Sequence, residues 1–150
     1  MADPTAVFDK DVGVWDAESE IRPGPGAPPI RLKGVSTNRR IGGGRWLVVD
    51  YVADGGFEGH GIYGFDPDRQ KYTGIWVDST RTAISHAQGT WDANTRTMTF
   101  VTEVVHDGRT IRYREITETL ADGSQIYRNL VASPDGGEFE MIKTVYRRRG

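Results

Sequence analysis

The chain has 150 residues, of which 37% are hydrophobic and 27% are charged, and its formal net charge at neutral pH is −2. This length is enough for one domain with a buried core, and the balanced charge gives no overall attraction for nucleic acid or an anionic membrane surface. The absence of cysteine excludes disulfides, thiolate metal sites and cysteine nucleophiles. We therefore expect a single domain over residues 1–150, with neither nucleic acid nor membrane as its partner.

The N-terminal segment differs from a targeting segment. Residues 1–12 contain three aspartates and no apolar run, which is unlike a signal peptide. No stretch approaches the roughly 18 apolar residues that are needed to span a bilayer. A cytoplasmic location is the resulting expectation.

The order of residue types along the chain is typical of an all-β protein. Residues 4–12 predict one or two helical turns with Asp3 as cap. Runs rich in Val, Ile, Thr, Tyr and Trp follow, separated by Gly, Asp, Asn and Pro about every ten residues. The predicted strands are 13–22, 31–41, 45–53, 57–66, 71–78, 83–92, 97–106, 109–120, 124–132 and 138–147. About ten strands joined by tight turns favour a single antiparallel up-and-down β-barrel, because closure removes exposed edges.

One connection in this pattern differs from the others. Residues 22–30 contain four prolines and two glycines, which exclude helix and ladder pairing. Two interpretations stay open: a stiff connector between the first two strands, or a rim loop over the barrel mouth.

The turns predict which residues face one another across the sheet. Asp107-Gly108 and Asp122-Gly123 are typical of two-residue hairpin turns, and residues 42–44 and 54–56 of three-residue loops. In these registers four aromatic residues cover cross-strand glycines: Tyr51 opposite Gly59, Trp76 opposite Gly61, Tyr63 opposite Gly74 and Phe100 opposite Gly89.

The same registers place the large apolar residues on one face, which we expect to be inside. It contains Leu47, Val49, Tyr51, Phe57, Tyr63, Phe65, Tyr72, Trp76, Trp91, Met98, Phe100, Val104, Ile111, Tyr113, Phe139 and Met141. Glycines and small residues such as Ala83 and Ala87 share this face, which favours a hollow interior and leaves a fully packed one as the alternative.

Several spaced motifs identify a family that the chain resembles. They are Phe57-x-Gly59-x-Gly61-x-x-Gly64-Phe65-Asp66-Pro67, Lys71-Tyr72, Trp76-Val77-Asp78-Ser79, Gly13-x-Trp15, Gly43-Gly44-Arg45-Trp46-Leu47 and Tyr146-x-Arg148-Arg149. Together they cover nearly the whole chain and resemble a bacterial group of lipocalin-like (calycin) barrels, catalogued only as a domain of unknown function. The resemblance implies the barrel and an internal cavity, and it implies no catalytic residues.

Polar residues on the expected inner face are the candidates for chemistry. They are Arg39, Asp78, Ser85, Tyr113, Glu115, Arg128 and Lys143. Arg128 opposite Lys143 would be a like-charge clash, so that the register slips there or a carboxylate lies between them. Buried charges otherwise serve as structural pairs, which is the plainer interpretation of this set.

The first functional hypothesis is a barrel that binds a small hydrophobic or aromatic ligand, which is anionic if the arginines contact it. The expected ligand-binding residues are Arg39, Tyr51, Tyr63, Trp76, Tyr113 and Arg128. The alternative is a cofactor-independent isomerase, cyclase or hydrolase with Asp78 or Glu115 as general base, its pKa raised by the cavity. A third role, purely structural, corresponds to the packed interior.

The histidines do not predict a metal site, because His60, His86 and His106 lack the spacing of zinc ligands. We expect neither metal nor cofactor. The expected partner is a small molecule, and a homodimer is left open.

Overall fold

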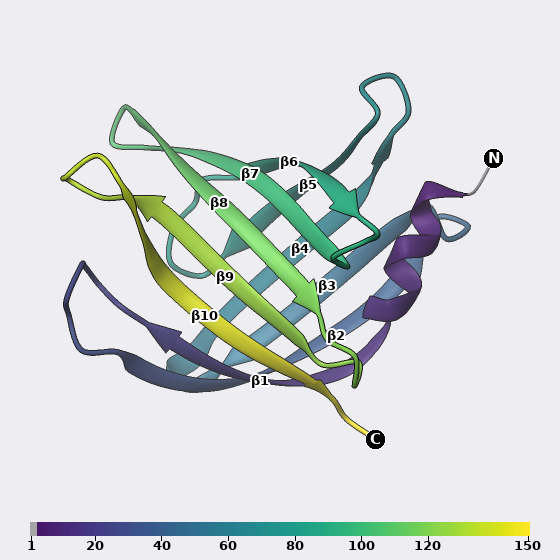
Figure 1. Cartoon of the computed structure of the whole chain (residues 1–150), viewed down its shortest axis with the longest axis horizontal. Coiled ribbons are helices and arrows are strands. Elements are labelled where there is room, and N and C mark those ends of the chain that lie inside the picture. The colour runs from purple at the N-terminus through teal and green to yellow at the C-terminus, as the bar shows by residue number, and fades with distance from the viewer. Residues whose placement is uncertain (1–2) are drawn as a thin grey trace.

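The protein is an all-β barrel with two short 3₁₀ helices, the longer of which lies at the N-terminus (Figure 1). The computed structural model describes residues 3–150; residues 1 and 2, the start of the domain expected over 1–150, lie outside the described residues. The elements are η1 (Pro4–Asp11), β1 (Gly13–Ile21), β2 (Ile30–Ile41), β3 (Trp46–Ala53), η2 (Asp54–Gly56), β4 (Phe57–Asp66), β5 (Lys71–Asp78), β6 (Ser85–Asp92), β7 (Thr97–His106), β8 (Arg109–Thr119), β9 (Gln125–Ala132) and β10 (Glu138–Arg148). All predicted strands are present, and their ends differ from the prediction by no more than two residues.

The strands form one closed antiparallel sheet in chain order, and β10 returns to pair with β1. Alternate residues face inward, as a pleated strand requires. In β1, for example, Trp15, Ala17 and Ser19 are buried and the residues between them are exposed. The up-and-down calycin-like barrel expected from the sequence is therefore confirmed.

Three of the hairpin registers agree with those expected from the turns. Tyr51 pairs with Gly59, Tyr63 with Gly74, and Phe100 with Gly89. The Phe100 ring covers its glycine closely, because a Cβ built at Gly89 would lie 2.7 Å from Cδ1 of the ring. Tyr63 likewise covers Gly74. Trp76 covers Gly59, the diagonal neighbour of its direct partner, and Tyr51 reaches Gly34 on the other side.

Two hairpin loops are longer than expected, and each shifts the register by one residue, which reverses the faces of the strand that it joins. Ile41 pairs with Trp46, so residues 42–45 form a four-residue loop. Thr119 pairs with Gln125, and the backbone N–H of Gly123 donates to the carbonyl of Leu120 in a turn with Gly123 at φ +88°. The second geometry is a turn followed by a left-handed glycine, whereas Asp107-Gly108 forms the expected two-residue turn with both φ values positive.

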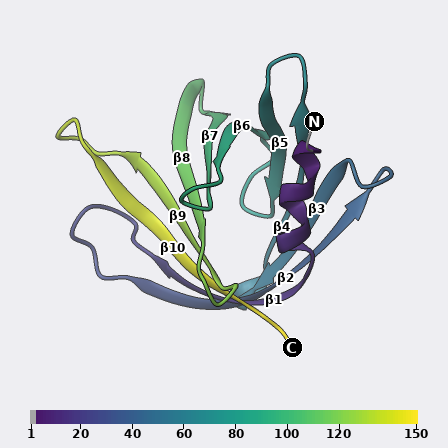
Figure 2. The ribbon, with the colours of Figure 1, turned by 45° about the vertical axis from the view of Figure 1, so that its right-hand side comes forward.

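The helix η1 closes one end of the barrel. Its cap is the predicted one, since the Asp3 carboxylate accepts a hydrogen bond from the backbone N–H of Thr5 at 2.9 Å. Phe8 is 3% exposed and packs in a cluster with Leu47, Tyr72 and Met98. Figure 2 shows η1 lying beside the ends of β3 and β4. The hydrophobic core therefore sits at this end of the barrel.

Candidate ligand-binding cavity

The interior of the barrel beyond this core is hollow. A cavity of about 460 Å³ extends from Phe8 and Asp11 on the η1 side to Asp78 and Arg81 near the opposite end. That opposite end carries the loops after β1, β3, β5, β7 and β9, and within the described residues its one helical segment is the three-residue η2 in the loop after β3 (Figure 1). The proline-rich residues 22–29 join β1 to β2 there, so they lie at the rim of the open end. This volume is in the range of small-molecule sites.

One wall of the cavity is aromatic. The side chains come from β3, β4, β5 and β7, and they are Tyr51, Phe57, Tyr63, Trp76 and Phe100. The Tyr51 and Phe57 rings meet edge to face with centroids 5.9 Å apart, and those of Tyr63 and Phe100 are 5.6 Å apart. Such contacts hold the rings in fixed positions, which gives a rigid surface for a flat or apolar group.

The facing wall carries a hydrogen-bonded polar cluster on β8 and β9. The Tyr127 hydroxyl donates to Oε2 of Glu115 at 3.1 Å. The Asn129 side-chain amide donates to the Tyr127 hydroxyl oxygen at 3.2 Å. All three side chains line the cavity. They form a chain in which each donor is aimed at the next acceptor.

The cluster lies in an environment that disfavours charge. Burial raises the pKa of Glu115 above its ordinary value, although the nearby Thr102 and Tyr127 hydroxyls act in the opposite direction. Burial and the Glu115 carboxyl likewise raise the pKa of Tyr63 and hold that of Tyr127 well above its ordinary value. Tyr146, which also lines the cavity, has its pKa raised by burial and by neighbouring acidic groups. The tyrosines are neutral at physiological pH as a result.

Two buried polar atoms beside Glu115 have no partner within residues 3–150. They are Oγ1 of Thr102 and Oδ1 of Asn129, in residues that are 5% and 6% exposed. The Thr102 hydroxyl is near the Glu115 carboxyl but does not meet hydrogen-bond geometry with it. Buried polar atoms are normally paired, so these two are open for a bound molecule or water.

Asp78 lies nearer the open end and is held differently from Glu115. Its carboxylate accepts hydrogen bonds from Nε1 of Trp76 at 2.9 Å and from the backbone N–H of Thr80 at 2.8 Å. Burial alone would raise the pKa of Asp78, but the hydrogen bonds from Thr80 and Trp76 outweigh it and leave the pKa lowered. Asp78 therefore stays ionised and orients Trp76. The cavity raises the pKa of Glu115 and not that of Asp78.

Two residues expected on the inner face lie outside the barrel. Arg39 pairs with Val48 and donates to Oδ2 of Asp50 at 2.7 Å on the outer surface, and Arg128 forms an ion pair there with Glu140. The inward assignment of both arginines was wrong, because each of the two altered loops shifts the register by one residue and so reverses the faces.

Lys143 is also on the outer face, directly opposite Arg128. Of the two expected resolutions, the carboxylate is the one found, since Glu140 pairs with Arg128. The bulge at Met141 shifts the register between Glu140 and Ile142 and leaves Arg128 opposite Lys143. The repulsion between the two cations is thereby reduced, since a carboxylate lies beside them.

The remaining predicted site residues do line the cavity. These are Tyr51, Tyr63, Trp76, Asp78, Tyr113 and Glu115. The residues that the sequence argument missed are Thr102, Tyr127, Asn129 and Tyr146. A five-residue loop at 120–124 would have placed Tyr127 and Asn129 inward, because it pairs Thr117 with Tyr127.

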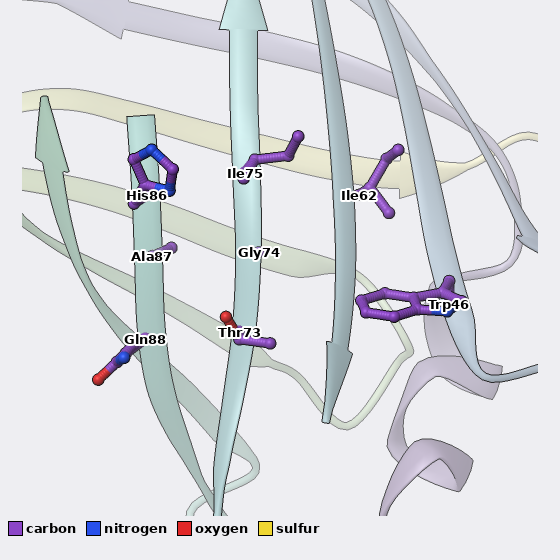
Figure 3. A pocket seen from close by; sticks show the side chains of 8 residues that line it. All are labelled: Trp46, Ile62, Thr73, Gly74, Ile75, His86, Ala87 and Gln88. Atoms are coloured by element: carbon purple, nitrogen blue, oxygen red, sulfur yellow. The ribbon is translucent and has the colours of Figure 1, made fainter. Parts of the chain in front are cut away.

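A second hollow of about 350 Å³ lies on the outer surface over β3 to β6. Figure 3 shows its side chains, among which Trp46, Ile62 and Ile75 provide apolar surface and His86 and Gln88 the polar groups. No chain of hydrogen-bonded groups converges in it within the described residues. The interior cavity therefore has the better-defined chemistry.

No group of three or more His, Cys, Asp or Glu side chains in residues 3–150 is arranged to hold a metal ion. Across the same residues, no helix is long and apolar enough to cross a membrane.

The fold and the cavity define a class: closed ten-stranded antiparallel barrels of calycin type. The sequence model of the family described as "Protein of unknown function (DUF1579)" matches residues 2–148, and the chain belongs to that family. This confirms the resemblance found in the sequence motifs. The crystal structure of Rv2717c from M. tuberculosis is similar, with a TM-score of 0.73 over 100% of both chains at 10% sequence identity, which shows a shared fold. No curated protein matches the chain.

Proposed function

We propose that the barrel binds a small hydrophobic or aromatic molecule in its interior. The observation that carries the proposal is the cavity of about 460 Å³, with an aromatic wall facing the Glu115–Tyr127–Asn129 cluster. An apolar enclosure with a few convergent polar groups is the usual form of a small-molecule site. The two arginines on which an anionic ligand was expected are outside, so the proposal does not include a negative charge on the ligand.

The first test is native mass spectrometry of the protein purified from its host, followed by denaturation to release any bound molecule. We expect a stoichiometric small molecule with an apolar body. A protein that is empty, and whose melting temperature does not change with a panel of lipids, aromatic alcohols and amines, would contradict the proposal.

A cavity-filling variant tests the location of the site. Ala87 is 6% exposed and lines the cavity from β6, whereas the next residue, Gln88, points outward on the same strand. We expect Ala87→Phe to abolish binding, because the ring occupies the volume that the ligand needs. Gln88→Phe adds the same ring outside and serves as the matched control. Binding by isothermal titration calorimetry that is equal in both variants would place the site elsewhere.

One observation favours catalysis as the second candidate function. Glu115 is a buried carboxyl with a raised pKa and a hydrogen bond from Tyr127, which suits a general acid or base. In that case Glu115→Gln abolishes turnover of the released ligand or its analogues and spares binding of neutral compounds. Asp78 no longer fits this role, since its pKa is lowered and its oxygens are occupied. The cytoplasm remains the proposed location, which cell fractionation tests.

A further inference from the structure

The polar cluster in the cavity leaves hydrogen-bond acceptors unfilled. The Glu115 carboxyl accepts one hydrogen bond, from Tyr127, and the Tyr127 hydroxyl oxygen accepts one from Asn129. Oδ1 of Asn129 and Oγ1 of Thr102 have no partner within residues 3–150, although both residues are more than nine-tenths buried. An amide oxygen can only accept, so the group that completes the cluster must bring hydrogen-bond donors.

No lysine or arginine side chain of the described residues supplies a hydrogen bond or a charge to the Glu115–Tyr127–Asn129 cluster. Lys10 lines the η1 end of the cavity, but its ammonium donates to the carbonyl of Val7 and to Oδ2 of Asp11, both at 2.9 Å. Arg81 lines the other end, where its charge acts on Asp78. No lysine or arginine in the described chain forms an ion pair with Glu115. A buried carboxyl of this kind is a site for an incoming cation, because pairing offsets the cost of its ionisation.

The surroundings of Glu115 fit a cationic head on an apolar body. The Tyr63, Trp76 and Phe100 rings line the same cavity, and the face of an aromatic ring attracts a cation. The titratable and charged groups that face Glu115 or line the cavity with it are Tyr51, Tyr63, Tyr113, Tyr127, Tyr146, Lys10, Asp11, Asp78 and Arg81. Burial keeps Tyr63, Tyr127 and Tyr146 protonated, so they do not compete for the cation with a negative charge and can only donate or accept hydrogen bonds.

We propose that the ligand of this cavity is a basic amine, whose ammonium group binds Glu115, Asn129 Oδ1 and Thr102 Oγ1 while its apolar part lies against the aromatic wall. This inference rests on the proposed binding function. The ammonium group supplies the missing donors, up to three N–H bonds, to the three acceptors. A Glu115 carboxyl that carries a proton in the empty cavity loses it on binding: the carboxylate pairs with the ligand, and the proton leaves to the solvent. Charge inside the cavity is therefore balanced before and after binding.

The experiment compares three ligands with one apolar body: 2-(1-naphthyl)ethylamine, 2-(1-naphthyl)ethanol and 1-naphthylacetate. Isothermal titration calorimetry at pH 6 in two buffers with different ionisation enthalpies gives both the affinity and the number of protons released. We expect the amine to bind at least about tenfold more tightly than the alcohol or the carboxylate, which is the scale of one charge-assisted hydrogen bond. We also expect proton release on binding of the amine alone.

Two variants locate the effect. Glu115→Gln should remove both the preference for the amine and the proton release, and leave binding of the alcohol nearly unchanged. Glu138→Gln is the control, because it neutralises an exposed carboxylate outside the cavity that pairs with Arg114. That variant should keep the preference.

The outcomes separate this inference from the function on which it rests. If the alcohol or the carboxylate binds the wild-type protein as tightly as the amine, or if the amine preference survives Glu115→Gln, the inference is wrong and the binding function stands. If none of the three ligands binds and the protein from its host is empty, both are wrong. If Glu115→Gln fails to fold, the comparison of the three ligands on the wild-type protein still tests whether the cavity prefers an amine.

Discussion

Glu115 is a buried carboxyl in the wall of the barrel cavity. Its neighbours across the sheet are Phe100 and Asn129, so an apolar ring lies on one side of the carboxyl and an amide on the other. Burial favours the protonated form, while the hydrogen bond from Tyr127 favours the charged one, and burial has the larger effect. A carboxyl with a raised pKa must bind its proton more tightly in the folded than in the unfolded chain.

This linkage predicts a pH dependence of stability. Below the unfolded pKa of about 4.3 both states are protonated, and the contribution of Glu115 is fully present. As the pH rises through the folded pKa, the unfolded state ionises more easily and the free energy of unfolding falls. Glu115→Gln cannot ionise, so we expect it to lose less stability than the wild-type protein over this range, by about 1.4 kcal/mol per unit of pKa shift.

Urea unfolding of both proteins between pH 4 and pH 8 measures the effect. All other groups are common to the two chains, which makes the difference between the curves specific to Glu115. Parallel curves over the whole range would show that the carboxyl has an ordinary pKa in the folded state.

Some of the residue contacts could be predicted from the sequence and others could not. The pairs Tyr63–Gly74 and Phe100–Gly89 were predictable, because a ring and a bare backbone opposite each other leave a local signature. The polar cluster was predictable only in part. The inward position of Glu115 can be predicted from the two-residue turn at Asp107-Gly108. The inward positions of Tyr127 and Asn129 depend on the next loop, and the residue types at 120–124 do not predict its length.

At the scale of elements, the hairpin loops decide the face on which each side chain lies. Asp122-Gly123 has the same two residue types as Asp107-Gly108, yet only the latter forms a two-residue turn. The difference arises because Gly123 alone takes the left-handed conformation in a longer turn, where the Asp122 carboxylate accepts from the Ser124 N–H at 2.9 Å. A shift of one residue then sends Arg128 outward and Tyr127 inward.

The helix η1 contributes to stability through one large side chain. Phe8 is 3% exposed, and its ring meets that of Tyr72 edge to face at 5.8 Å. Phe8→Ala leaves a void among Leu47, Tyr72 and Met98, and we expect the free energy of unfolding to fall by about 3 kcal/mol. Urea denaturation followed by tryptophan fluorescence measures it. Val105→Ala is the control, since Val105 is 61% exposed and its truncation should change stability little. Equal losses in the two variants would mean that η1 does not pack firmly on the barrel.

At the scale of the whole molecule, closure is what removes the sheet edges. The pairing of β10 with both β1 and β9 is the last to form in chain order, and it leaves no strand with a free edge in the barrel. Exposed edges are sites of association between chains. The bulge at Met141 lies in β10, and it bends this strand where the barrel closes.

A truncated chain tests the importance of closure. Ending the protein at Ala132 removes β10 and exposes the edges of β1 and β9, so we expect aggregates or an unfolded chain in size-exclusion chromatography and circular dichroism. A chain ending at Arg148 keeps all of β10 and should remain folded, because it loses only the exposed ion pair of Arg149 with Asp16 and one backbone hydrogen bond, from the Arg149 N–H to the Val14 carbonyl. A folded, monomeric product of the first truncation would contradict this view of closure.

The position of the C-terminus has a practical consequence. The Arg148 guanidinium donates to the carbonyls of Lys10 and Val12, so β10 ends beside η1, at the closed end of the barrel (Figure 1). The open end faces the other way. A protein attached to a solid support through its last residue would therefore present the cavity entrance to the liquid. Such a surface could capture ligands from a cell extract and release them for identification, without any tag near the binding site.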